Sequence, residues 1–228
     1  MLIYLKRTKL IDRVLPSYTK GEEIFNMVTH IVGGALGVIG IILVPIFAGF
    51  HHNVYGIVSG IIFGFSMILL YSMSSIYHGL SPKLKAKKVF QILDHCSIFI
   101  LIAGSYTPFC LCTLREYNPI TGYSILAIIW LAAILGVIFN SIDIKKYKVL
   151  SMVCYLLMGW CIIVKINILP NLLTIPGFVL LLLGGIIYTI GAVLYGVGKK
   201  HKYIHSVFHI FIFLGNLLHF LCILLYVV

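Results

Sequence analysis

Seven long apolar segments limit what this chain can fold into. They lie at 27–49, 55–78, 91–113, 120–139, 147–166, 175–197 and 203–226. Each is close to the roughly 20 residues that an α-helix needs to cross the hydrocarbon core of a bilayer. The loops between them are short. We therefore expect an all-α, multi-pass protein of the cell membrane, built as a bundle of seven transmembrane helices.

Composition agrees with a membrane protein and excludes a water-soluble globule. The chain is 61% hydrophobic and 10% charged, whereas soluble domains carry about 25% charged residues. The first residues are basic and lack the apolar core and cleavage site of a secretory signal. We expect 1–22 to be a basic cytoplasmic tail and 23–228 to be one transmembrane domain.

The positions of the basic residues predict the orientation of the chain. Fifteen of the seventeen lysines and arginines fall in the tail or in alternate loops. They are Lys6, Arg7, Lys9, Arg13 and Lys20; Lys83, Lys85, Lys87 and Lys88; Lys145, Lys146 and Lys148; and Lys199, Lys200 and Lys202. Only Arg115 and Lys165 remain for the other side. The positive-inside rule then places the N-terminus in the cytoplasm and the C-terminus outside.

This distribution also explains the net charge of +11. The charge is first a topology signal and second an attraction to anionic lipid headgroups. We therefore expect membrane lipids, and no nucleic acid, as partners.

Small residues predict where helices pack closely. Gly33 and Gly37 are four residues apart, as are Gly56, Gly60 and Gly64, and such spacing lets two helix backbones approach. The segment 104–108, Gly-Ser-Tyr-Thr-Pro, is too polar to face lipid. Its proline removes a backbone donor, so we expect a local kink that lines an internal cavity.

Ionisable residues gather at one depth of the predicted bundle. Such side chains are costly in hydrocarbon and usually mark function. The predicted topology brings four separate segments to the cytoplasmic side. Their polar residues are Glu23, Asn26 and His30 at the first span, Ser74 and His78 at the end of the second, Asp94 at the start of the third, and His205 and His209 at the start of the seventh.

The spacing of the histidines predicts a zinc site. His205 and His209 are four apart on a helix, so their side chains share one face. His78 is the natural third ligand, and three protein ligands with an open position are typical of catalytic zinc. Ser74 lies one turn before His78 and is suited to orient a water or a substrate carbonyl. Asp94 is either a fourth ligand or the group that orients the bound water.

Each residue also has a structural interpretation. An isolated His-x-x-x-His on an apolar helix often serves packing or hydrogen bonding. Glu23 and Asn26 either cap the first helix or support the site. His30 and His95 suit buried hydrogen-bonding roles. The other histidines are interpreted as interfacial or incidental: His51, His52, His201 and His219.

The motifs together resemble the bacterial haemolysin III family, the prokaryotic branch of the progestin and adipoQ receptor superfamily. They are Glu23-x-x-Asn26-x-x-x-His30, Ser74-x-x-x-His78, Leu93-Asp94-His95, the run 103–109 (Ala-Gly-Ser-Tyr-Thr-Pro-Phe) and His205-x-x-x-His209. The resemblance covers nearly the whole chain. It implies seven helices and a zinc ion near the cytoplasmic side, held by the residues at His78, His205 and His209, with a water at Asp94. It also implies distant kinship to alkaline ceramidases, which hydrolyse lipid amides.

Two functions from different classes follow. The first is a zinc-dependent hydrolase of lipid amides or esters, in which Asp94 takes a proton from water and Ser74 assists. The second is a non-enzymatic protein, either membrane-active as a haemolysin or sensing the state of the bilayer, with a structural zinc. A structural zinc should be closed by a fourth protein ligand.

Overall fold

The computed structural model describes residues 8–197 and 202–228, and these form a bundle with seven helices long and apolar enough to cross a membrane. In chain order its helices are η1 (Leu10–Asp12), α1 (Lys20–Phe50), α2 (Val54–Gly79), α3 (Lys85–Pro108), η2 (Phe109–Leu114), α4 (Arg115–Tyr117), α5 (Pro119–Ile142), α6 (Lys148–Trp160), η3 (Cys161–Lys165), α7 (Leu169–Val197) and α8 (Ile204–Tyr226). Helix α3, η2 and α4 together make one span, as do α6 and η3. The predicted fold class is confirmed.

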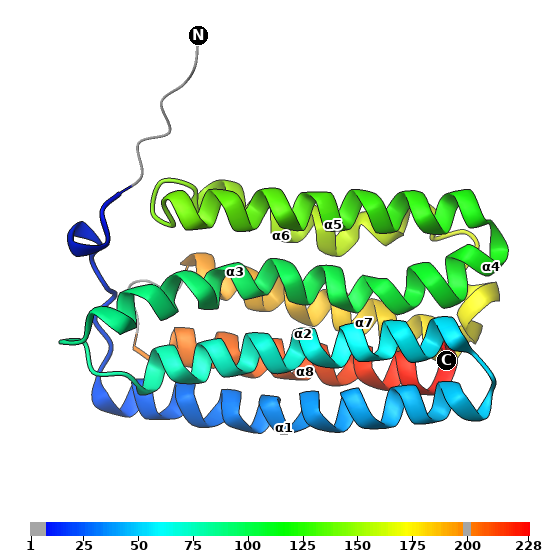
Figure 1. Ribbon diagram of the computed structural model, residues 1–228, viewed down its shortest axis with the longest axis horizontal. Coiled ribbons are helices and arrows are strands. Elements are labelled where there is room, and N and C mark those ends of the chain that lie inside the picture. The colour runs from blue at the N-terminus through cyan, green and yellow to red at the C-terminus, as the bar shows by residue number, and fades with distance from the viewer. Residues whose placement is uncertain (1–7, 198–201) are drawn as a thin grey trace, which may run out of the picture.

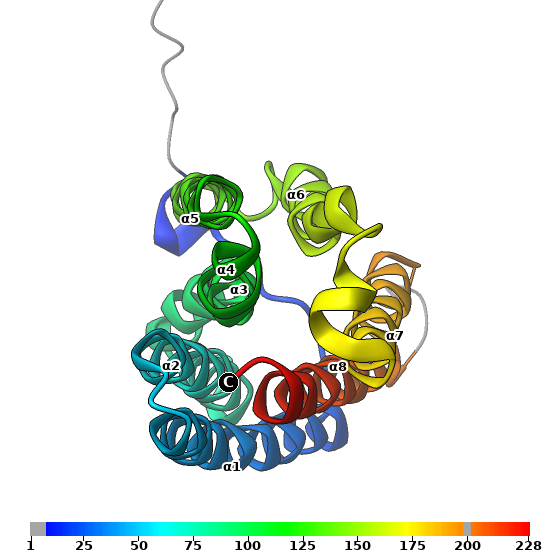
Figure 2. The ribbon, with the colours of Figure 1, turned by 90° about the vertical axis from the view of Figure 1, so that its right-hand side faces the viewer.

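The helices run along the long axis of the molecule (Figure 1). Viewed along that axis, they form a ring that is closed where α1 meets α8 (Figure 2). Helix α3 lies on the inner side of α5 and is the most buried span. We call the end that holds the start of α8 the histidine end, and the opposite one the far end.

Helix α1 begins earlier than hydropathy predicted because a capping box starts it. The Thr19 hydroxyl accepts a hydrogen bond from the Glu22 N–H, and the Glu22 carboxylate accepts one from the Thr19 N–H at 2.8 Å. Such reciprocal bonds satisfy donors that a helix start leaves unpaired. The cap therefore belongs to Thr19 and Glu22. Glu23 and Asn26 lie inside α1, where their side chains serve other contacts.

Glycines allow α1 and α2 to pack closely, as predicted. A β-carbon on Gly64 would lie 2.5 Å from the Ile41 Cα, and one on Gly37 would lie 2.9 Å from the Ile68 nitrogen. Both neighbours are backbone atoms, which cannot turn aside as a side chain can. Only glycine fits at these positions without moving the helices apart.

The polar segment of α3 lines an internal cavity, as predicted, and the helix type changes directly after it. The backbone changes from α-helix to π-helix directly after Pro108. Ser105 and Tyr106, just before it, line an internal cavity. π-Helical turns are rare, and those inside α-helices frequently occur at functional sites.

The chain before α1 lies across the histidine end (Figure 1). The Arg13 Nη2 donates to the carbonyls of Ser141 and Ile142 at 3.1 and 3.0 Å, and the Thr8 hydroxyl donates to the Asp143 carboxylate. Partial burial opposes ionisation of Asp143, but hydrogen bonds from Thr8 and nearby backbone N–H groups outweigh it and lower its pKa. Part of the predicted tail is thus docked. Lys6, Arg7, Lys199, Lys200 and His201 lie outside the described residues.

Candidate metal centre

Three histidines from two helices meet at the histidine end. His78 lies in the last turn of α2, and His205 and His209 lie in the first turns of α8. One ring nitrogen of each lies within 4.8 Å of the other two. The Nε2 atoms of His205 and His209 are 3.0 Å apart. This is near the roughly 3.3 Å that two nitrogens on one tetrahedral zinc ion would have with Zn–N bonds of about 2.0–2.1 Å.

Glu23 fixes the orientation of His78. The carboxylate accepts a hydrogen bond from the His78 Nδ1 at 2.6 Å, so this nitrogen carries the proton. The His78 Nε2 is buried and has no hydrogen-bond partner. Carboxylates that hold the second nitrogen of a ligating histidine are a common feature of metal sites. The donor set fits a divalent transition metal such as zinc, which imidazole ligands favour.

Lys87 completes this arrangement and was not singled out from the sequence. Its Nζ donates to the other Glu23 oxygen at 2.7 Å and to the Leu80 carbonyl at 2.9 Å, and the residue is 1% exposed. The charge pattern places it in the loop after the second span, but α3 begins at Lys85 and carries it into the bundle. One signal was present: Lys87 lies seven residues before Asp94, on the same helix face.

The remaining predicted residues surround the three histidines. Asp94 lies outside the group of nitrogens within 4.8 Å, but it lines the same cavity as His205, His209 and Ser74. Ser74 is fully buried, and its hydroxyl has no partner. His30 stacks on His209 with ring centroids 3.8 Å apart, and neither of its ring nitrogens has a hydrogen-bond partner.

Asn26 packs beside His78 without a clear hydrogen bond to it. Its Nδ2 lies 3.5 Å from the His78 Nδ1, whose proton is already donated to Glu23. Two donors facing each other do not form a bond, so Asn26 contributes packing at this contact.

His95 takes a hydrogen-bonding role. Its Nδ1 donates to the Gln91 carbonyl at 2.8 Å, and its Nε2 accepts from the Tyr195 hydroxyl at 3.3 Å. Its carbonyl accepts a 2.9 Å bond from the Tyr155 hydroxyl. These bonds hold α3 in place next to Asp94. Both ring nitrogens are engaged, so His95 is not part of the three-histidine group.

The interpretation of His219 as interfacial or incidental was wrong. It lies in the wall of the internal cavity, where its Nε2 donates to the Leu181 carbonyl at 3.3 Å. Helices α7 and α8 pack so closely here that a β-carbon on Gly184 would meet its ring. His51 and His52 lie at the far end and are exposed.

Tyr18, in the chain segment before α1, covers two of the three histidines. Its ring stacks on His205 with centroids 5.1 Å apart and lies 5.7 Å from the ring of His78. Burial raises the pKa of its phenol well above the ordinary value, so the hydroxyl stays protonated. Sequence periodicity gave no signal for this residue because it precedes the first helix.

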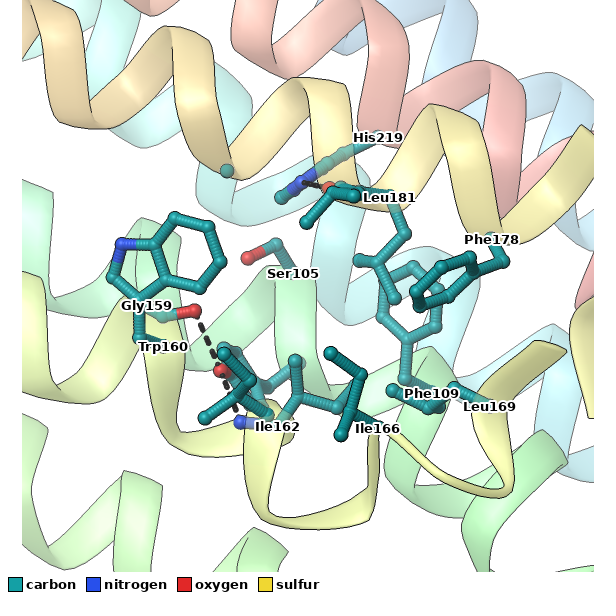
Figure 3. Close-up of a pocket in the computed structure, with 14 residues that line it drawn as sticks. Ser105, Phe109, Gly159, Trp160, Ile162, Ile166, Leu169, Phe178, Leu181 and His219 are labelled. Atoms are coloured by element: carbon teal, nitrogen blue, oxygen red, sulfur yellow. Dashed lines mark hydrogen bonds between the residues drawn. The ribbon is translucent and has the colours of Figure 1, made fainter.

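An elongated cavity of about 130 Å³ leads from the site into the bundle. Ser74, Asp94 and His205 line one end, and Tyr106, Trp160 and His219 line the other. Its walls between these ends are mainly apolar and include Leu70, Ile98, Leu101, Ile102, Leu156 and Ile212. A second pocket of about 40 Å³ shares His219 and Trp160 with it and continues to Phe178 and Leu169 (Figure 3).

Comparison with known proteins gives the family. The haemolysin-III related family matches residues 18–220. Hemolysin-3 of Bacillus cereus is 42% identical over 90% of this chain and 92% of its own length. The hemolysin-3 homolog of Bacillus subtilis is 39% identical over 92% of this chain and 97% of its own length.

A more distant match extends to animals. The monocyte to macrophage differentiation factor of Homo sapiens, from the progestin and adipoQ receptor family, is 28% identical over 71% of this chain and 67% of its own length. The resemblance inferred from the motifs is confirmed. Together with the seven helices, these matches show that this multi-pass membrane protein belongs to the haemolysin-III related family.

Proposed function

We propose that this protein is a zinc-dependent hydrolase that cleaves lipid amides or esters within the bilayer. His78, through its Nε2, would hold the ion together with His205 and His209. The observation that carries the proposal is the set of residues that line one cavity. A carboxylate and an unpartnered hydroxyl, those of Asp94 and Ser74, line it beside the histidines, and its remaining walls are mainly apolar. An acyl chain fits the walls while its carbonyl group reaches the polar end.

Bound zinc would lower the pKa of a bound water molecule and would polarise the carbonyl group of the substrate. The protein's own groups do the rest. The Asp94 carboxylate accepts a proton from the attacking water and returns it to the leaving amine or alcohol. The Ser74 hydroxyl donates a hydrogen bond to the substrate carbonyl oxygen. Glu23 keeps the His78 proton on Nδ1, which leaves Nε2 free to bind.

The charge distribution supports a cytoplasmic position for the site. With the N-terminus in the cytoplasm, the histidine end lies in the inner leaflet, on the side of the fifteen basic residues. A polar leaving group would then be released to the cytoplasm, and the fatty acid would stay in the bilayer.

The test is fatty acid release by purified protein from ceramides and other acylated lipids, measured beside zinc content. Asp94→Asn should keep zinc, because three histidines remain, yet lose release because an amide cannot accept the proton. Asp12→Asn, a change to an exposed acid at the same end, should keep both. No release by the parent protein across the panel would refute the hydrolase. Loss of zinc in Asp94→Asn would make Asp94 a direct ligand.

A second candidate is a non-enzymatic protein that lyses membranes or senses the bilayer and uses zinc as a structural brace. The name of the Bacillus cereus relative, Hemolysin-3, favours it. In that case Asp94→Asn should lyse erythrocytes as well as the parent does, with no fatty acid released by either protein.

A further inference from the structure

Two buried polar atoms at the end of the cavity away from the three histidines have no hydrogen-bond partner. They are the Tyr188 hydroxyl on α7 and the Nδ1 of His219 on α8. Both residues line the cavity, and their ring centroids are 5.2 Å apart. The Tyr188 ring lies across Gly215, where an added β-carbon would come within 2.8 Å of it. Buried polar groups normally have partners, so a pair of unpaired ones beside a cavity indicates a ligand.

The neighbouring polar groups are already paired. The Tyr106 hydroxyl donates to the Gly159 carbonyl at 2.8 Å and accepts from the Ile162 N–H at 3.0 Å, as the dashed lines in Figure 3 show. The Trp160 Nε1 donates to the Thr189 hydroxyl at 2.9 Å. Among the described residues that line this part of the cavity, only Tyr188 and His219 therefore have a buried polar atom without a hydrogen-bond partner.

The hydrogen bond to Leu181 determines what His219 requires. Because a carbonyl only accepts, the His219 Nε2 carries the proton and its Nδ1 is an acceptor. The Tyr188 hydroxyl can donate. A ligand hydroxyl satisfies both, since it donates one hydrogen bond and accepts another. A ketone oxygen would only accept, and a plain hydrocarbon chain would leave both atoms unpaired.

We propose that this part of the cavity is a hydroxyl-binding subsite and that the acyl chain held by the protein carries a mid-chain hydroxyl. Gly215 and His219 lie six and ten residues beyond His209 on α8. A rise of 1.5 Å per residue puts the subsite roughly 9–15 Å from the histidines, which is a mid-chain distance for a fatty acid whose carbonyl lies at the metal site. The inference rests on the proposed lipid function and adds the chemical class of the lipid.

Removing a hydroxyl that serves a ligand should change thermal stability differently from removing one that bonds within the protein. Removing the unpartnered hydroxyl in Tyr188→Phe breaks no bond within the protein and should leave thermal stability unchanged or slightly higher. The matched control is Tyr106→Phe, in the same cavity, which removes a hydroxyl with two partners and should lower the melting temperature.

The experiment compares two fatty acids that differ by one group. Ricinoleic acid is oleic acid with a mid-chain hydroxyl. Dissociation constants for both are measured on purified, zinc-loaded protein in detergent, together with an oleic acid hydroxylated next to the carboxylate. We expect ricinoleic acid to bind roughly tenfold more tightly than the other two. Tyr188→Phe should reduce this preference to about twofold, and Tyr106→Phe should retain it.

The outcomes separate the subsite from the enzyme. Equal affinity for oleic and ricinoleic acids, or a preference that survives Tyr188→Phe, would overturn the subsite, and the two atoms would then bind water only. A hydroxyl preference that depends on Tyr188, found in a protein that releases no fatty acid from any lipid, would overturn the hydrolase and leave the subsite standing.

Discussion

The pair formed by Glu23 and Lys87 supports a stringent test, because the Glu23 carboxylate contacts both a buried lysine and a histidine of the proposed zinc site. The Lys87 ammonium is buried, and its partner carboxylate, whose side chain is 16% exposed, also holds His78. Replacing one member of a buried ion pair costs about 3–5 kcal/mol, because the other charge is left uncompensated. Lys87→Met leaves the Glu23 carboxylate its bond to His78, so we expect a loss near the lower value, about 3 kcal/mol.

A double variant separates the two roles of the pair. Glu23→Gln combined with Lys87→Met removes both charges, so most of the lost stability should return. The zinc affinity of the double variant should be lower than that of the parent, because the amide is a poorer acceptor for the His78 proton. Loss of such a supporting contact typically weakens metal binding by about 10–100-fold.

Two measurements on purified protein in detergent micelles decide the matter. Denaturant unfolding of the zinc-free protein gives the change in the free energy of unfolding, and competition with a chelator gives the zinc dissociation constant. Lys85→Met, an exposed change in the first turn of the same helix, is the control and should alter neither. The reasoning fails if the double variant is as unstable as Lys87→Met, or if it binds zinc as tightly as the parent.

Three further predictions concern the whole molecule. A reporter fused after Val228 should be accessible only from outside the cell, and one in the 80–84 loop between α2 and α3 only from inside, as the basic residues predict; cytoplasmic access to the C-terminus would contradict this. Elemental analysis should find about one zinc per chain, mostly lost in His78→Ala, His205→Ala and His209→Ala. His52→Ala, at the exposed far end, should keep it, and equal zinc in all four variants would disprove the site. Gly64→Ala should destabilise by about 1–3 kcal/mol in unfolding assays, because its β-carbon would meet the backbone of Ile41. Gly49→Ala, which meets nothing within 4 Å, should be neutral, and equal effects would refute the packing argument.

The amino-acid sequence alone determined the membrane architecture. Hydrocarbon admits only apolar spans whose backbone groups bond internally, so seven apolar segments could become little else than seven helices. The same cost of burying charge made Asp94, His78, His205 and His209 conspicuous. The four-residue spacing of His205 and His209 fixed their common face before any tertiary contact was known.

Only the tertiary structure decided which groups support that site. Lys87 looks like one more basic residue after α2. It becomes the buried partner of Glu23 only because α3 begins early and packs beside α2, from where the Lys87 side chain reaches α1. Tyr18 lies outside any periodic pattern, and it covers His205 because the chain before α1 is held across the histidine end. His219 and Tyr188 look like ordinary span residues until α7 and α8 bring their rings together beside a cavity. Periodicity reports which face of a helix a residue lies on, but contacts between distant segments depend on how the helices are placed around one another.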